Sequence, residues 1–396
     1  MEVSRRAFVA TAASASRVMG ANDRVRLGWI GTGSRGQHLI RMAAASGVDC
    51  EVVALCDAWD QRREEAAAEV AKRFPSAPKP ALIAKYKDLL GRKDIDAVVV
   101  ATLDHTHAGI ASEACRAGKD AFVEKPMTSM PMQGHELVKA QRDNKRVVQV
   151  GVQQRSIAHF IEAKQQFVDS GLLGKVHMAR TLWNANGGYL TPVPPGMEIK
   201  PAGLDWDAVL GWLPKIPWDA KRYFNRFAYW DFATGGQTGG LFVHMVDVVH
   251  WYLGIKRPMA AAAMGGIYQY NDGRDTADNV NFLLEYPEKL TVTFEATITD
   301  MRGEESADIV FFGEGGRLSI FRGRARFLPQ GKGEPVMMKG TPEPPHMANF
   351  LECVKSRKDP NATAYDGHYA AMACHIGNIA YKERRVIQWR KEWDIA

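Results

Sequence analysis

The sequence is short of cysteine and of long apolar runs, and each shortage excludes a class of protein. It has five cysteines in 396 residues, at scattered positions and without a C-x-x-C pair. That pattern argues against a disulfide framework and against a structural zinc site. No apolar run approaches the ~20 residues that a membrane-spanning helix needs. With 46% hydrophobic and 24% charged residues, the composition is typical of a globular protein without a membrane span.

The sequence also lacks a block of charge of one sign. Its formal net charge is +6, but lysine and arginine are interspersed with aspartate and glutamate. A nucleic-acid-binding surface would need a concentrated basic stripe, so no nucleic-acid partner is expected. An H-E-x-x-H motif and a paired-carboxylate pattern are both missing, and we expect no metal site.

The N-terminus carries a twin-arginine pattern. "SRRAFV", from Ser4 to Val9, precedes the small-residue stretch "ATAASAS". This resembles a twin-arginine export signal and predicts a periplasmic protein. The apolar part is short and no clean A-x-A cleavage site follows. The alternative is a disordered N-terminal arm on a cytoplasmic protein, and in either case residues 1–22 are excluded from the fold.

A glycine-rich turn follows the first apolar segment. "VRLGWIGTGSRGQHLI" reads as a strand, a turn and a helix start, with three glycines spaced G-x-G-x-x-G. Gly31 permits the tight turn, Gly33 lets the backbone approach a pyrophosphate, and Gly36 lets the helix pack on the strand. The sequence therefore predicts a dinucleotide site at this turn. The expected contacts of the turn are Gly31, Thr32, Gly33, Ser34, Arg35 and Gly36.

An acidic residue ends the next predicted strand, "EVVALCD", at Asp57. A carboxylate at this place accepts hydrogen bonds from the ribose hydroxyls and repels a 2′-phosphate. We therefore expect NAD rather than NADP as the cofactor.

Strands and helices continue to alternate up to about residue 150. "IDAVVVAT", "DAFVEKP" and "VVQVGVQQR" read as further strands, and the alternation predicts a doubly wound parallel sheet over residues 23–150. Ligands of such sheets bind beyond the carboxyl ends of the strands. Several polar residues follow strand ends directly: Thr102, Asp104, His105, His107, Glu124, Lys125 and Gln153.

Four of these stretches together resemble one family. "GWIGTGSRG", "VVVATLDHTHA", "VEKPMT" and "QVGVQQRS" occur in the order found in the Gfo/Idh/MocA oxidoreductases, and the resemblance covers nearly everything from Val25 onward. It implies a Rossmann domain followed by a C-terminal α/β domain on a large open, mainly antiparallel sheet. It also implies NAD(P)-dependent oxidation or reduction of a sugar, polyol or glycoside carbon. Subunits would associate through the open sheet into a homo-oligomer, a dimer or tetramer.

The resemblance gives roles to particular residues. Lys125 matches the lysine of the family's EKP motif, which contacts the reacting hydroxyl and takes part in its proton relay. The resemblance also implies a cis peptide bond between Lys125 and Pro126. A lysine beside a positively charged nicotinamide has a depressed pKa, which suits that task. Asp104 and His107 match a loop on the nicotinamide side. The expected cofactor contacts outside the glycine turn are Asp57, Thr102, Asp104, His107, Glu124, Lys125 and Gln153.

A second domain is expected over residues 151–345. Residues 184–235 contain no long periodic segment, and a loop of that length in a compact protein is usually functional. We expect most of its aromatic side chains to pack the loop onto the domain, with one or two facing the cleft. These aromatic residues are Trp206, Trp212, Trp218, Tyr223, Tyr229 and Trp230. Residues 258–328 read as an antiparallel meander, and residues 346–396 as helices that pack back near the sheet and the Rossmann domain.

The segment "GGLFVHMVDVVHW" places His244, Asp247 and His250 three residues apart. On a helix these residues step round by about −60° each, so one ion could take two of them but hardly all three. The resemblance implies that His244 faces the nicotinamide and exchanges the proton of the reacting hydroxyl. Asp247 would fix the helix or contact the sugar, and His250 would be structural. Many family dehydrogenases carry an aspartate where this chain has Gly240.

Three functions are compatible with these residues. The first is an NAD-dependent sugar or glycoside oxidoreductase, with Lys125 and His244 as catalytic residues. The second is a glycoside hydrolase or lyase that keeps NAD bound and oxidises the sugar ring transiently, with Tyr223 or Tyr229 as an additional base. The third is a non-catalytic sugar or NAD sensor, which the absence of an acid at Gly240 motivates. The expected substrate contacts are Lys125, Arg155, Trp183, Asn184, Arg222, Tyr229, His244 and Asp247.

Overall fold

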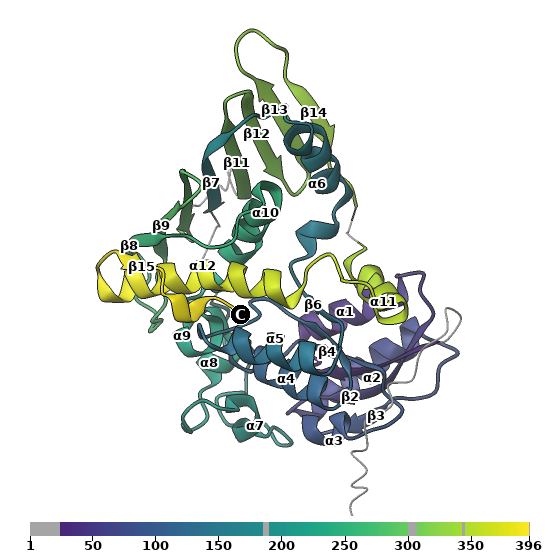
Figure 1. The fold of residues 1–396 in the computed structure, drawn as a ribbon. Coiled ribbons are helices and arrows are strands. Elements are labelled where there is room, and N and C mark those ends of the chain that lie inside the picture. Colours follow the sequence, from purple (N-terminus) through teal and green to yellow (C-terminus); the bar gives the residue numbers. More distant parts are fainter. Residues whose placement is uncertain (1–23, 185–189, 300–306, 343–344, 396) are drawn as a thin grey trace, which may run out of the picture.

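The computed structural model describes residues 24–184, 190–299, 307–342 and 345–395, and these form two α/β halves (Figure 1). The twin-arginine stretch lies outside the described residues. Across the described ranges, no helix is both long and apolar enough to cross a membrane. The N-terminal half is a parallel sheet between helices, and the C-terminal half is a larger mixed sheet with helices on one face.

The N-terminal half is the predicted doubly wound parallel sheet. Its six strands lie in the order β3-β2-β1-β4-β5-β6, and every pair is parallel. They are β1 (Val25–Ile30), β2 (Cys50–Cys56), β3 (Ala81–Ile83), β4 (Ala97–Val100), β5 (Asp120–Val123) and β6 (Val148–Val150). β4, β5 and β6 are buried along their whole length, as expected for strands covered on both faces. The order reverses between β1 and β4, which opens a crevice at their carboxyl ends.

Five helices cover this sheet. They are α1 (Ser34–Ala44), α2 (Asp60–Arg73), α3 (Tyr86–Leu90), α4 (His107–Arg116) and α5 (Gln133–Asp143). A short 3₁₀ turn, η1 (Asp104–Thr106), leads from β4 into α4, and η2 (Gln153–Ser156) leads out of the domain after β6. Because all strands of this sheet are parallel, the residues that follow them lie along the same edge.

The C-terminal half is built on a nine-stranded sheet in the order β14-β13-β12-β11-β7-β10-β9-β8-β15. β7 (Val176–Asn184) runs parallel to β10 (Leu290–Thr297), and the other pairs are antiparallel. The remaining strands are β8 (Ala260–Gly266), β9 (Asn279–Tyr286), β11 (Ala307–Gly313), β12 (Gly316–Phe321), β13 (Arg324–Pro329), β14 (Val336–Lys339) and β15 (Ile387–Gln388). The expected antiparallel meander is present and gains β7, β14 and β15, which the sequence pattern of residues 258–328 did not include.

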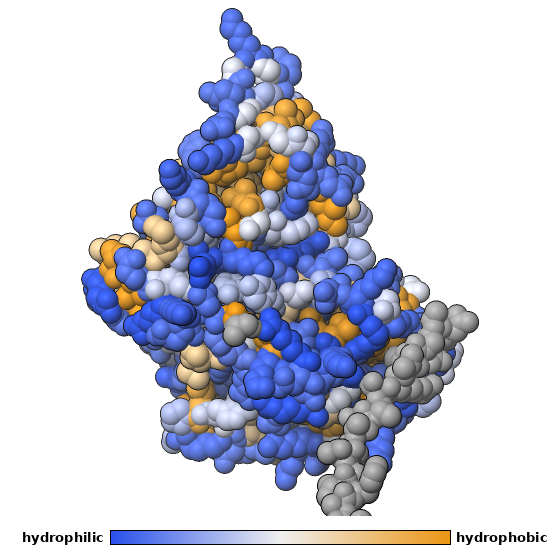
Figure 2. All heavy atoms as spheres, viewed as in Figure 1, coloured by the Kyte–Doolittle hydropathy of each residue, from blue (hydrophilic) through white to orange (hydrophobic). Residues whose placement is uncertain are grey.

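Buried and more exposed residues alternate along the central strands of this sheet, so that one face of the sheet is buried and the other is not. In β9 and β10 every second residue is buried, and Phe282 lies opposite Phe294 in the register. Phe242, from the segment before α10 (Val243–Leu253), stacks on Phe294 with ring centroids 4.6 Å apart. The helices α6 (Ala158–Ala163) and α10 lie on this side, and Figure 2 shows hydrophobic side chains gathered near α10 and the sheet on an otherwise mostly hydrophilic face.

Two C-terminal helices connect the halves. α11 (His346–Ser356) packs beside α1, and α12 (Ala364–Glu383) crosses between the two sheets (Figure 1). α12 begins at a capping box, in which Thr363 and Asp366 each accept a backbone N–H of the other. It contacts α5 and β6 on one side and α10 and β8 on the other, so it packs against both halves.

The described part of the segment between β7 and α10, residues 190–242, has no long helix or strand. It contains α7 (Trp206–Leu210), α8 (Ala220–Phe224), η4 (Arg226–Ala228) and α9 (Trp230–Ala233), and a π-helical turn, η5 (Thr238–Phe242), runs into α10. Trp206, Tyr229 and Phe232 form a small core of their own. Residues 203–227 are called the strap below, because they lie across the carboxyl edge of the parallel sheet.

Candidate active site

A cavity of about 980 Å³ lies at the carboxyl edge of the parallel sheet. Its floor comes from the ends of β1, β2, β4 and β5, its roof from the strap, and its far wall from the start of α10. The predicted site residues that line it are Gly31, Gly33, Ser34, Arg35, Asp57, Thr102, His107, Glu124, Lys125, Gln153 and His244. The structure thus brings together residues from both halves of the chain.

The glycine turn leaves room for a phosphate. Gly31 has a φ of +91°, and a Cβ there would lie 2.5 Å from the Ala101 carbonyl. A Cβ on Gly36 would lie 2.2 Å from the Gly31 oxygen, so the helix packs directly on the turn. A Cβ on Gly33 would meet nothing within 4 Å, and α1 starts at the next residue without a side-chain cap. The free N–H groups of that helix start therefore face open space, as a bound pyrophosphate requires.

Asp57 is fixed to the glycine turn. Its Oδ2 accepts from the Thr32 backbone N–H at 2.7 Å and its Oδ1 from the Trp59 N–H at 3.1 Å. Burial raises the pKa of Asp57, while these hydrogen bonds oppose the shift. Thr32 itself is fully buried and is not among the residues that line the cavity. Asp57 lines the cavity beside the turn, where it can accept from ribose hydroxyls.

Glu124 and Lys125 follow β5 at the centre of the cavity floor. The Glu124 carboxylate accepts from Arg35 Nε at 2.7 Å and from the Lys125 backbone N–H at 3.2 Å. Lys125 is followed by a cis peptide bond to Pro126. The buried Lys125 ammonium donates to the carbonyl oxygen of Gly240 at 2.7 Å. Burial lowers the pKa of Lys125 to about 8, although Glu124 and Asp104 oppose the shift.

Gly240 has no space for a larger side chain. A Cβ at this position would lie 2.7 Å from Cε1 of Phe227, whose ring covers it. The strap therefore fills the place where the family resemblance led us to look for an aspartate. In this chain the Gly240 main-chain oxygen, instead of a carboxylate, holds the Lys125 ammonium.

His244 lies on the wall opposite the sheet. It is the second residue of α10, is 6% exposed and lines the cavity. Its Nδ1 has no hydrogen-bond partner among the described residues. Burial and the nearby cations Lys125, Arg322 and Arg35 keep the pKa of His244 well below its usual range. The imidazole is therefore neutral at physiological pH, with one ring nitrogen unused.

Asp104 and His107 were both expected on the nicotinamide side, and the structure places them differently relative to the cavity. His107 lines the cavity, and its ring nitrogens lie 2.8 Å from the Pro126 oxygen and 3.2 Å from the Thr102 oxygen. Asp104 lies behind the wall, where it accepts from Thr234 Oγ1 at 3.2 Å and contacts Arg226 at 3.5 Å. Asp104 thus acts on the cavity through its neighbours.

Two of the expected substrate contacts pair with each other away from the cavity. Arg155 makes a bidentate ion pair with Asp247, at 2.8 and 2.9 Å, and both side chains are buried. Burial raises the pKa of Asp247 to about 6 against the effect of Arg155. His250 lies 2.7 Å from the Tyr286 hydroxyl, which fits the structural role expected for it. The ion pair between Arg155 and Asp247 joins η2 to α10.

Lys125 and His244 line the cavity, but four further expected substrate contacts, Trp183, Asn184, Arg222 and Tyr229, do not. Trp183 packs against the core of the C-terminal half with Arg322 over its ring, and Asn184 ends β7 opposite Thr297. Arg222 donates to Asp231 at 2.7 Å and stacks over Tyr229. Contact of any of these residues with a substrate stays a prediction.

The sequence did not single out most of the strap residues that form the roof. The strap contributes Asp205, Asp207, Ala208, Val209, Gly211, Trp212, Tyr223, Phe224, Asn225, Arg226 and Phe227. Of the six aromatic residues considered from the sequence, Trp212 and Tyr223 line the cavity and the other four do not. The strap is held on both sides: the Asp205 N–H donates to the Ala58 oxygen at 2.9 Å, and His105 Nε2 lies 3.2 Å from the Val209 oxygen.

The fold and the cavity define a two-domain dinucleotide-binding oxidoreductase. Residues 25–152 match a family model for the NAD-binding Rossmann fold of an oxidoreductase family, and residues 165–394 match the model for the C-terminal alpha/beta domain of the same family. The chain belongs to the Gfo/Idh/MocA oxidoreductase family, and its Rossmann domain binds NAD. No group of three or more His, Cys, Asp or Glu side chains in the described part is placed to hold a metal ion.

Named relatives and solved structures share parts of the chain. Inositol 2-dehydrogenase 1 of Saccharopolyspora erythraea is 30% identical over 194 residues, which are 48% of this chain and 54% of that protein. A glycosyl hydrolase family 109 protein of Shewanella baltica is 40% identical over 110 residues, 26% of this chain and 23% of that protein. Levoglucosan dehydrogenase in complex with NADH and levoglucosan has the same fold, with a TM-score of 0.71 and 17% sequence identity. The superposition covers 92% of this chain and 99% of that one. The chain thus spans about half the length of the inositol dehydrogenase and about a quarter of the length of the glycosyl hydrolase.

Proposed function

We propose that the protein is an NAD-dependent oxidoreductase that moves a hydride between nicotinamide and a carbinol or keto carbon of a sugar, polyol or glycoside. The observation that carries this proposal is the meeting of Lys125 and His244 on the cavity that the glycine turn and Asp57 open onto. When bound, NAD supplies the hydride acceptor at its nicotinamide ring. The named sugar-alcohol and sugar dehydrogenases among the relatives and fold neighbours support the substrate class.

The two catalytic residues differ in their suitability as bases. Lys125 has a pKa of about 8, close to the pH at which an enzyme works, so it can take and return the proton of a reacting hydroxyl. The pKa of His244 is well below its usual range, which makes it a weak base. We assign proton exchange to Lys125 and orientation of the hydroxyl to the neutral His244 ring. This shifts the proton-exchanging role expected for His244 towards Lys125.

The strap favours a second candidate function. It roofs the cavity and is bonded to both sides of the nucleotide-binding edge, so a dinucleotide would leave slowly. A retained cofactor suits a glycosidase that oxidises the ring, eliminates the aglycone and returns the hydride, and the family 109 relatives point the same way. The additional base would have to be another group than Tyr223, because burial raises the pKa of Tyr223 to about 12.

One experiment separates these functions. One portion of the purified protein is denatured to release and quantify bound NAD, and a native portion is incubated with NAD and a panel of polyols, neutral sugars, sugar acids, sugar phosphates and nitrophenyl glycosides. The dehydrogenase produces nicotinamide absorbance in step with substrate oxidation, and the glycosidase releases nitrophenol without net NADH. Neither signal from the native protein, together with tight NADH binding, would leave only the sensor. Lys125→Ala should abolish the signal, whereas Lys139→Ala, at an exposed pair on α5, should not.

Export and assembly belong to the same proposal. The twin-arginine pattern supports a periplasmic location, and replacing Arg5 and Arg6 by lysine should retain the protein in the cytoplasm in a fractionation experiment. The open face of the nine-stranded sheet exposes Leu283 and Met264 and supports association between subunits. Light scattering of Leu283→Glu against the native protein tests that surface.

A further inference from the structure

A second cation stands on the cavity wall beside Lys125. Arg226 begins η4 in the strap, lines the cavity, and has a side chain that is 32% exposed. Its guanidinium stacks on the Phe227 ring at 4.7 Å. Its one hydrogen bond among the described residues is to Asp104, at 3.5 Å.

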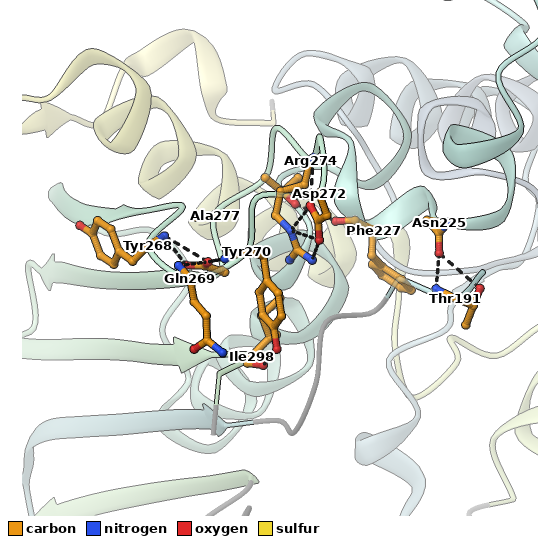
Figure 3. Close-up of polar contacts among 12 residues, drawn as sticks. Thr191, Asn225, Phe227, Tyr268, Gln269, Tyr270, Asp272, Arg274, Ala277 and Ile298 are labelled. Atoms are coloured by element: carbon orange, nitrogen blue, oxygen red, sulfur yellow. Dashed lines mark hydrogen bonds and ion pairs between the residues drawn. The ribbon is translucent and has the colours of Figure 1, made fainter. Parts of the chain in front are cut away.

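The backbone that carries Arg226 is held on both sides. Asn225, before it, accepts with Oδ1 from the Thr191 N–H at 2.6 Å, and Phe227, after it, accepts with its carbonyl oxygen from Thr276 Oγ1 at 2.9 Å. Figure 3 shows Asn225 and Thr191 on one side of Phe227, and the loop with Asp272 and Arg274 on the other. A side chain on such a fixed backbone is prearranged for a ligand rather than free to follow it.

The ion pair of Arg226 with Asp104 is longer than those of two other buried or half-buried arginines of this protein, Arg155 and Arg274. Arg155 and Arg274 each make charge-assisted hydrogen bonds of 3.0 Å or less to both oxygens of one carboxylate. Arg226 approaches a single oxygen of Asp104 at 3.5 Å, outside the usual range for such a bond, and Thr234 takes the other oxygen. The guanidinium fork therefore keeps donors for a second, bidentate partner.

The charges around this end of the cavity favour an anion. Lys125 and Arg226 both line it, Glu124 is already paired with Arg35 at 2.7 Å, and Asp104 lies behind the wall. His244 presents a buried Nδ1 without a partner among the described residues. At Gly240, where a carboxylate would balance the cations, there is only a main-chain oxygen.

We propose that Arg226 binds an anionic group, a carboxylate or a phosphate, on the sugar substrate, and so selects sugar acids or sugar phosphates over neutral sugars. This inference rests on the proposed oxidoreductase or glycosidase function and names the substrate class of that same cavity. Arg226 is a specificity-determining residue here, since it binds a part of the substrate that does not react.

The test is calorimetric binding to the NADH-loaded protein, which does not depend on turnover. The probes are gluco-, galacto- and manno-configured hexoses, their uronates and their 6-phosphates. One charged series should bind at least tenfold more tightly than its neutral hexose, and the tighter series identifies carboxylate or phosphate as the group. Arg226→Gln should remove most of that advantage and leave hexose binding unchanged, while Arg226→Lys should retain part of it. Lys221→Gln, the same charge change at an exposed strap position, should change nothing.

Two results would overturn the assignment in different ways. Equal affinity for charged and neutral sugars, or an equal loss of both in Arg226→Gln, would mean that Arg226 only holds Asp104. A protein that fails to take up NADH would overturn the proposed function, and the assignment with it.

Discussion

At the scale of single residues, burial lowers the pKa of both Lys125 and His244, and the extent of each shift decides which of the two exchanges the proton. Lys125 is drawn down to a pKa of about 8 because its ammonium is buried, whereas Glu124 and Asp104 keep the shift from going further. His244 has no described acidic partner, and the shift in its pKa is correspondingly large. The sequence placed both residues at the site, but their relative basicity depends on burial, which spacing alone does not give.

The first prediction concerns pH. As the pH rises through about 8, Lys125 loses its proton, so carbinol oxidation should accelerate about tenfold per pH unit below 8 and level off above it. Carbonyl reduction, which needs the protonated form, should stay level below pH 8 and fall about tenfold per pH unit above it. Lys125→Arg keeps the charge but removes the base, and should lower kcat about 10²- to 10⁴-fold. A flat profile for the native protein between pH 6 and 9 would exclude Lys125 as the proton-exchanging group.

The second prediction concerns Gly240. Gly240→Ala places a Cβ 2.7 Å from the Phe227 ring, so overpacking should destabilise the protein by about 1–3 kcal/mol. Thermal unfolding of Gly240→Ala and of Gly240→Ala with Phe227→Leu measures this, and the double variant should recover part of the loss. Unchanged stability of the single variant would show that Phe227 moves aside at no cost.

At the scale of elements, the strap is the part of the site that sequence reasoning read least well. Its short helices α7 and α8 are five residues each, too short for a helical period to stand out. They are fixed by contacts with the first domain, such as Asp205 with Ala58, which are remote in the sequence. Its length and aromatic content were the available signals, and they indicated a functional loop without showing which side chains face inward.

The third prediction follows from the roof. The ring of the half-exposed Trp212 lies against Gly109 at the cavity edge and packs little in the core. Trp212→Ala should speed NADH dissociation about five- to thirtyfold, as expected for an aromatic contact of about 1–2 kcal/mol, and leave stability nearly unchanged. Stopped-flow displacement measures the rate. Ile199→Ala, at an exposed position just before the strap, is the matched control.

At the scale of the whole molecule, the two halves share one buried ionic junction. Arg155 from η2 pairs with Asp247 of α10 and lies 3.4 Å from Asp366 at the start of α12. The parallel sheet, its order and the glycine turn were predictable because local patterns dictate them. This junction was not predictable, since three distant segments form it. Arg155 was predicted as a substrate contact, and Asp247 as a residue that fixes the helix or contacts the sugar.

The fourth prediction tests the junction. Asp247→Asn leaves the Arg155 guanidinium buried with only Asp366 nearby, and should cost about 3–5 kcal/mol of unfolding free energy. Asp143→Asn, at an exposed pair with Lys139, should cost no more than about 1 kcal/mol. Urea unfolding of both variants gives the comparison. If Asp247→Asn keeps its stability but loses sugar affinity, Asp247 contacts substrate after all.

The packing of Phe227 on Gly240 also restricts how this protein can change over generations. A carboxylate at position 240 is not accessible by one substitution, because the aromatic ring occupies its volume. The Phe227 ring has to be lost first. That substitution alone would expose the hydrogen bond between Lys125 and the Gly240 oxygen without supplying a new acid. The residues at positions 240 and 227 are therefore coupled, and an acid at position 240 requires a smaller side chain at position 227.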